Sequence, residues 1–210
     1  MLAAAVLLAT LGWTGANAGA QQANRTFVPH TANQVAFHDQ MRKLWEDHIT
    51  WTRLAIVGAV DELPDTALTV DRLLRNQDDI GAAIAPFYGQ AAGQQLTVLL
   101  REHITTAVEL VIAAKSGDTA GFEDAKARWY ANGEQIADFL AAANPRFWPR
   151  DVMRDAMRMH LDQTLAEAAH RIAGDHAAEI ADYEEIHAHI LVMADLLSAG
   201  IMQQFPSQVR

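Results

Sequence analysis

The sequence contains no cysteine among its 210 residues. Disulfides, thiolate zinc sites, iron–sulfur clusters, a cysteine nucleophile and covalently attached c-type haem are therefore excluded. Any metal site in this protein must be built from histidine, carboxylate, amide or methionine ligands.

Glycine, proline and charged residues are also sparse. The 12 glycines and 6 prolines are too few for a collagen-like, linker-rich or turn-dense all-β chain. Half of the residues are apolar and only 20% are charged, which predicts a folded protein with a large core rather than a disordered one. The formal net charge of −10 repels phosphate backbones, so we expect no nucleic-acid partner.

An apolar run lies near the start of the chain, at residues 2–13, and small residues follow it. Two A-x-A-like cleavage sites end at Ala18 and Ala20, although no lysine or arginine precedes the run. Because a bilayer-spanning helix takes roughly 20 apolar residues, this run predicts a signal peptide over residues 1–20. We expect an exported protein, periplasmic or extracellular, with a flexible segment at 21–34 and no transmembrane helix in the mature chain.

Two series of polar residues recur along the chain with nearly the same period. The first series is His48, His103 and His160, spaced by 55 and 57 residues. The second is Asn76, Asn132 and His187, spaced by 56 and 55 residues. Two series that keep one period indicate an internal repeat, with a diverged third copy.

Turn residues separate the two series within each copy, and proline-containing segments separate the copies. Each copy is therefore expected to be a helix, a short turn and a second helix. The expected helices are 35–62, 66–85, 90–115, 119–142, 150–173 and 176–204. The predicted fold is all-α, a single domain over 35–210 in which three repeated antiparallel helical hairpins, at about 35–88, 90–146 and 150–205, form a six-helix bundle.

Three short segments carry a resemblance to known sequences: Trp45-Glu46-Asp47-His48, Glu102-His103-Ile104 and His187-Ala188-His189-Ile190. With them the chain resembles uncharacterised exported bacterial all-helical proteins. The resemblance covers most of the mature chain and implies export and a helical fold. It implies no activity.

Helical periodicity places the histidines of both series on apolar stripes, which predicts a polar layer inside the bundle. Neutral imidazole is the commonest metal-binding side chain, and ligands from different helices can converge in a bundle core. We therefore expect a transition metal site (zinc, copper or iron) that serves storage, delivery or sensing rather than catalysis. The candidate ligands are His48, His103 and His160, with His187 as a fourth, the flanking Glu46 and Glu102, and the softer copper-type set His189, Met157 and Met193.

Three alternatives remain open at this stage. The polar groups could bond one another and fix how the hairpins align, a purely structural role. The second alternative, which agrees with such a structural role, is a non-enzymatic helical module that binds a small apolar ligand or a protein partner, with tryptophans lining the pocket. A di-iron site is the third alternative, since Glu167-x-x-His170 and Glu184-x-x-His187 match the Glu-x-x-His spacing of di-iron bundles.

Overall fold

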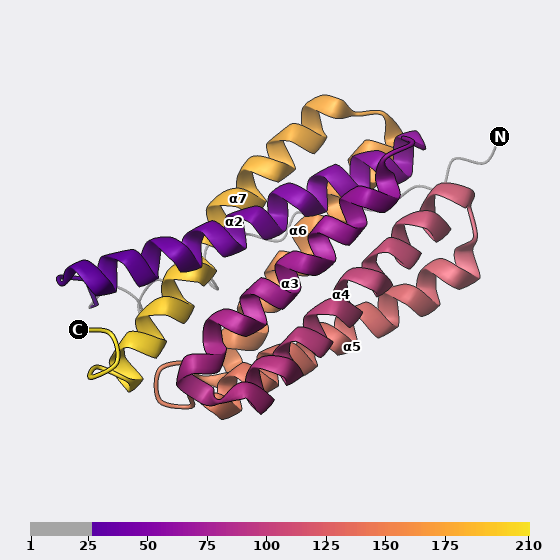
Figure 1. Ribbon diagram of the computed structural model, residues 1–210. Coiled ribbons are helices and arrows are strands. Elements are labelled where there is room, and N and C mark those ends of the chain that lie inside the picture. Colours follow the sequence, from indigo (N-terminus) through magenta and orange to yellow (C-terminus); the bar gives the residue numbers. More distant parts are fainter. Residues whose placement is uncertain (1–26) are drawn as a thin grey trace.

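The computed structural model describes residues 27–210, and within them every regular element is a long α-helix (Figure 1). The prediction of an all-α bundle of six helices is confirmed for this part of the chain. The predicted signal peptide lies outside the described residues. The helices are α2 (Ala32–Asp61), α3 (Thr66–Tyr88), α4 (Gln90–Ser116), α5 (Thr119–Ala143), α6 (Arg150–Ala173) and α7 (His176–Gln204).

The six helices form a closed ring of antiparallel neighbours. Each helix packs against the next one along the chain, and α7 packs against α2 to complete the ring. Helices α2, α4 and α6 also contact one another across the centre. Since neighbours alternate in direction, these three inner helices all run the same way, and side chains at equivalent heights can meet on the bundle axis.

Two helices extend three residues beyond the predicted bounds. Helix α2 begins at Ala32 rather than at residue 35, because the Thr31 hydroxyl caps it by accepting a hydrogen bond from the Gln34 backbone N–H. Helix α3 continues through Pro86 to Tyr88, whereas the proline was expected to end it. Pro86 lacks the N–H that would bond to the Ala82 carbonyl, so α3 continues past it with one backbone hydrogen bond fewer.

Helices α3 and α4 approach each other closely at two glycines. A Cβ atom built on Gly81 would lie 2.6 Å from the Gly93 carbonyl oxygen, and one built on Gly93 would lie 2.6 Å from the Gly81 carbonyl oxygen. These distances are shorter than van der Waals contact, so each position excludes any side chain. The two glycines thus set the spacing of these helices near the connection at residue 89.

Helix α7 is the most apolar of the six. It contains a stretch with a mean hydropathy of 1.3, long and apolar enough to cross a membrane, which the sequence analysis did not anticipate. Within the bundle 67% of that stretch is buried. Packing against the neighbouring helices therefore accounts for its apolar character.

Candidate functional site

Three histidines from the three inner helices meet in the core. His48 on α2, His103 on α4 and His160 on α6 are only 3 to 4% exposed. The ring centres of His48 and His160 are 5.7 Å apart, and those of His103 and His160 are 6.5 Å apart. The predicted layer of inward-facing histidines is therefore present for these three side chains.

Burial keeps these imidazoles neutral. Desolvation lowers the pKa of His48 to about 3, with a further contribution from His103. Desolvation also lowers the pKa of His103 to about 4. The pKa of His160 is lowered by desolvation and then by the neighbouring His48, His103 and His189. At neutral pH each ring therefore carries one N–H and one free nitrogen lone pair.

Each of the outer helices α3, α5 and α7 donates the same type of hydrogen bond to an inner helix. In each case a buried side chain of the outer helix donates to the backbone carbonyl four residues before the inner histidine. The donors and acceptors are Asn76 Nδ2 to the Leu44 oxygen (3.0 Å), Asn132 Nδ2 to the Leu99 oxygen (3.1 Å) and His189 Nε2 to the Ala156 oxygen (2.9 Å).

The outer-helix residue that makes the third bond of this type is His189, whereas the sequence analysis expected His187 at this level. His187 is partly exposed, and its Nε2 lies 2.9 Å from the Glu46 carboxylate. His189 is buried and occupies the position that Asn76 and Asn132 hold in the other outer helices. The spacing from Asn132 to His189 is 57 residues, the same as from His103 to His160.

The other candidate ligands lie at different depths. Glu46 and Glu102 are exposed and do not reach the histidine layer. Met157 and Met193 are buried in the main apolar core. Of the residues expected to hold a metal, the structure therefore gathers three histidines at the axis, places His189 beside His160 and leaves His187 and the two carboxylates at the surface.

Hydrogen bonds fix which nitrogen carries the proton in two of the rings. Asn132 uses its Nδ2 on Leu99, so its Oδ1 accepts from His103 Nδ1 at 3.0 Å, which leaves the Nε2 lone pair of His103 free. His189 donates from Nε2 to a carbonyl, so its Nδ1 is a bare lone pair. Within residues 27–210, neither His189 Nδ1 nor His160 Nδ1 has a hydrogen-bond partner, although both are buried.

His48 meets a different partner. Its Nδ1 lies 3.3 Å from Gln77 Nε2, and the same amide nitrogen is close to the Leu73 carbonyl oxygen and to Asn76 Oδ1. Two amide hydrogens face three acceptors, and Gln77 Oε1 is buried without a partner among the described residues. The Gln77 amide is thus incompletely satisfied where it touches the histidine layer.

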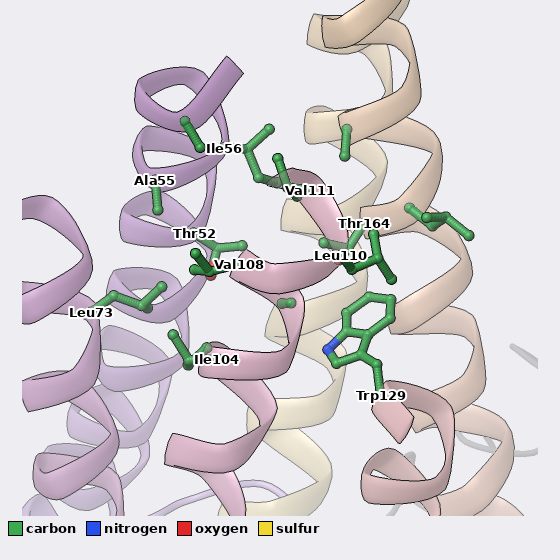
Figure 2. Close-up of a pocket in the computed structure, with 14 residues that line it drawn as sticks. Thr52, Ala55, Ile56, Leu73, Ile104, Val108, Leu110, Val111, Trp129 and Thr164 are labelled. Atoms are coloured by element: carbon green, nitrogen blue, oxygen red, sulfur yellow. The ribbon is translucent and has the colours of Figure 1, made fainter. Parts of the chain in front are cut away.

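Two tryptophans enclose the layer. The Trp129 indole stacks on the His103 ring, with centres 5.2 Å apart and planes 23° apart. Trp45 meets His48 edge-on at 5.7 Å. Trp129 also forms part of the wall of an apolar cavity between the helices (Figure 2). Metal binding at the histidines would therefore be visible in tryptophan fluorescence.

A second buried polar cluster, which sequence reasoning missed, joins α2, α6 and α7. Arg53 Nε donates to Glu179 Oε1 at 2.7 Å and lies 3.7 Å from Glu167 Oε1. Glu167 and Glu179 are 2% and 1% exposed. Desolvation, and then the charge of Glu179, raises the pKa of Glu167 to about 8 despite the nearby Arg53. Sequence reasoning considered Glu167 only as part of a Glu-x-x-His pair, and it singled out neither Glu179 nor Arg53.

The di-iron alternative is not supported by this arrangement. Glu184 is exposed, and His187 contacts Glu46 rather than a carboxylate of its own helix. His170 bonds to Asp182 at 2.5 Å, and Arg53 lies beside Glu167 where a cation would have to bind. The two Glu-x-x-His segments therefore do not converge on a shared position.

In the part of the chain that the structure describes, no three histidine or carboxylate side chains are close enough to hold a metal ion as they stand. Comparison with protein-family models, with curated proteins and with solved structures gave no match. The functional argument therefore depends on the geometry and chemistry of the core itself.

Proposed function

We propose that this protein binds a transition metal ion through His48, His103 and His160. The observation that carries the proposal is that three neutral imidazoles from three parallel helices lie on the bundle axis at the same height. Neutral imidazole is the form that ligates zinc, copper and iron, and the lowered pKa values preserve this form even in mild acid. The remaining requirement is that all three imidazoles can approach one ion.

The ring separations are close to those of a three-histidine site. Three imidazoles around one ion at about 2.0–2.1 Å, in tetrahedral directions, have ring centres roughly 5 Å apart. The separations in the core are 5.7 and 6.5 Å. For these two pairs, binding requires the ring centres to approach by roughly 0.7 and 1.5 Å, a change that we expect side-chain rotations of the histidines to supply.

The outer helices provide partners that orient the ligands. His103 would bind through Nε2, because Asn132 Oδ1 holds its Nδ1–H. If a metal binds His48 Nε2, the ring proton lies on Nδ1. The unpartnered Gln77 Oε1 can accept from this Nδ1–H after the Gln77 side-chain amide rotates by about 180°. His189, with a free Nδ1 lone pair, is the candidate fourth ligand. Met157 and Met193 are further soft ligands if the ion is Cu(I).

We also infer that the bundle consists of three copies of one helical hairpin, α2–α3, α4–α5 and α6–α7. The three hydrogen bonds to the carbonyl four residues before each inner histidine support this inference, since they recur at sequence separations of 32, 33 and 33 residues. A repeat of this kind gives the site its threefold arrangement. Burial of the site suits retention of an ion in an exported storage, delivery or sensing protein better than turnover of a substrate.

The test uses untagged full-length protein that has been stripped of metal. Zn(II), Cu(I) and Fe(II) are added separately, and the melting temperature and bound metal are measured. We expect one ion per chain and a rise in stability that follows RT ln(1 + [L]/Kd), about 2.7 kcal/mol at one hundred times Kd. In a separate titration with Cu(II), a quenching ion, binding should lower the fluorescence of Trp45 and Trp129, which contact the histidines.

The matched variants are His103→Gln at the site and His176→Gln on the surface, where the histidine is exposed. Loss of binding in the first with retention in the second supports the proposal. The proposal is overturned if no ion raises the melting temperature, or if the two variants bind metal equally well. Circular dichroism of each metal-free variant establishes that it is folded.

A further inference from the structure

An apolar cavity lies directly beyond the histidine layer on the bundle axis. Its wall includes Thr52 of α2, Ala107 of α4 and Thr164 of α6. Each of these residues is four positions after the axial histidine of its own helix, a distance of roughly 6 Å along the helix. Trp129 lies on the wall and also stacks on His103, so the cavity and the histidine layer share one side chain.

The cavity offers almost no polar group to an occupant. Its wall is otherwise made of alanine, valine, leucine and isoleucine side chains, and Figure 2 shows several of them directed at one another from different helices. The two threonine hydroxyls are already used, because Thr52 donates to the His48 carbonyl and Thr164 to the His160 carbonyl, each at 2.8 Å. A water molecule needs two to four polar partners, so this space favours an apolar occupant over water.

The size of the cavity limits the occupant. The space open to the centre of a water-sized sphere is about 40 Å³, several times the ~10–15 Å³ needed for one water. It is well below the ~150 Å³ of an engineered cavity that takes up benzene. The space therefore fits an uncharged molecule of a few atoms, the size of dioxygen or xenon.

The wall of the cavity is not uniformly buried. Ala59 and Val108 are only half-buried, whereas Leu73 and Trp129 are 2% exposed. The part of the wall formed by Ala59 and Val108 is therefore the part nearest to solvent.

We propose that this cavity is a binding site for a small uncharged apolar molecule of dioxygen or xenon size, one helical turn from the axial histidines. The proposal does not rest on metal binding, because the cavity is complete in the chain itself. Its position gives such a ligand direct access to the Trp129 face and to the histidine layer. A protein with both sites would hold a small apolar ligand next to its metal ion.

Xenon is the probe for this site, applied under pressure to metal-free, full-length protein with labelled methyl groups. We expect saturable methyl shifts in the NMR spectrum that are confined to the cavity wall, at Ile56, Ile104, Ala107 and Leu110. Dissolved dioxygen should cause paramagnetic relaxation at the same methyl groups. The absence of a localised, saturable shift in folded wild-type protein would overturn the proposal.

Two variants control the experiment. Ala107→Leu fills the cavity, and Ala127→Leu adds the same atoms at an exposed position of α5. The xenon shifts should disappear in Ala107→Leu and persist in Ala127→Leu. Equal shifts in the two variants would contradict the proposal. A third variant, Leu110→Ala, enlarges the cavity and should increase xenon uptake, which keeps the test decisive if Ala107→Leu does not fold. A negative xenon result does not bear on the proposed metal site, since the metal titration measures binding at the histidines.

Discussion

The side-chain amide of Asn132 bonds to His103 and to the backbone of the helix that carries His103. Its Oδ1 accepts from the imidazole Nδ1 at 3.0 Å, and its Nδ2 donates to the Leu99 carbonyl one turn earlier at 3.1 Å. One buried residue thus joins α5 to α4 and also fixes which nitrogen of His103 is free. At this position, the polar layer can therefore hold two helices together and also orient a proposed metal ligand.

Asn132→Ala removes both hydrogen bonds and leaves a buried imidazole N–H unpartnered. We expect the free energy of unfolding to fall by about 2 to 4 kcal/mol, since each unsatisfied buried group costs roughly 1 to 3 kcal/mol. Urea denaturation of metal-free protein measures the change. Gln95→Ala, at an exposed position of α4, should change the stability by less than about 0.5 kcal/mol. Similar losses in the two variants would refute this account of Asn132.

His189 should tolerate replacement by asparagine. Asparagine can keep the bond to the Ala156 carbonyl and can offer Oδ1 to His160 Nδ1, as Asn132 does for His103. We expect His189→Asn to be within about 0.5 kcal/mol of wild type in the metal-free state, and His189→Leu to lose about 0.5 to 1.5 kcal/mol because it removes the hydrogen bond to the Ala156 carbonyl. Thermal melts of the two variants decide the matter. An asparagine variant as unstable as the leucine variant would mean that the third hairpin is not equivalent to the second.

Acid should destabilise the protein through its core histidines. The pKa of His48 is about 3 and that of His103 is about 4 in the folded state, both below the ordinary value of 6.5 expected on unfolding. Stability from these groups is complete above pH 6.5 and is lost as the pH falls toward 4, by about 1.4 kcal/mol per pH unit for each histidine. Chemical denaturation between pH 7 and pH 4.5 measures this slope. His103→Gln should make it shallower by one histidine's share, whereas an unchanged slope would count against a neutral buried ring.

Glu167 should act in the opposite direction. Its pKa is raised to about 8, by burial first and then by Glu179, so the folded protein binds this proton more tightly than the unfolded chain. The stability that this proton contributes is complete below about pH 4.5 and is lost as the pH rises toward 8. Glu167→Gln should therefore gain stability over wild type between about pH 4.5 and 8, by up to about 1.4 kcal/mol per pH unit. Glu185→Gln, at an exposed site, should show no such trend in the same denaturation series.

The helices and their order could be predicted from sequence because their signals are local. Proline, glycine and aspartate mark the turns, and Asp118 and Asp175 do cap α5 and α7 by accepting from backbone N–H groups. The extension of α3 through Pro86 was missed because the proline was expected to end the helix, and no local pattern shows that the helix ends only two residues later. The closure of the ring by α7 on α2 was also not predicted, because no local pattern encodes contacts between helices so distant in sequence.

The histidine layer was predictable in part for the same reason. The nearly regular spacing of His48, His103 and His160 drew attention to them, and their burial was predicted from the apolar stripes around them. The choice of His187 over His189 failed because a two-residue shift rotates a helix position by about 200°, from core to surface. The pairing of Glu167 with Arg53 and Glu179 required knowledge of which helices are adjacent.

The contact between α7 and α2 has a consequence for how the chain could be cut and rejoined. These two helices pack as antiparallel neighbours, just as helices joined by a short turn do, and the Asn33 side chain donates to the backbone carbonyl of Arg210. The two ends of the bundle therefore meet without a covalent link. We expect a circular permutant that joins these ends and opens the chain at residue 89 to fold to the same bundle, because every helix would keep the same neighbours.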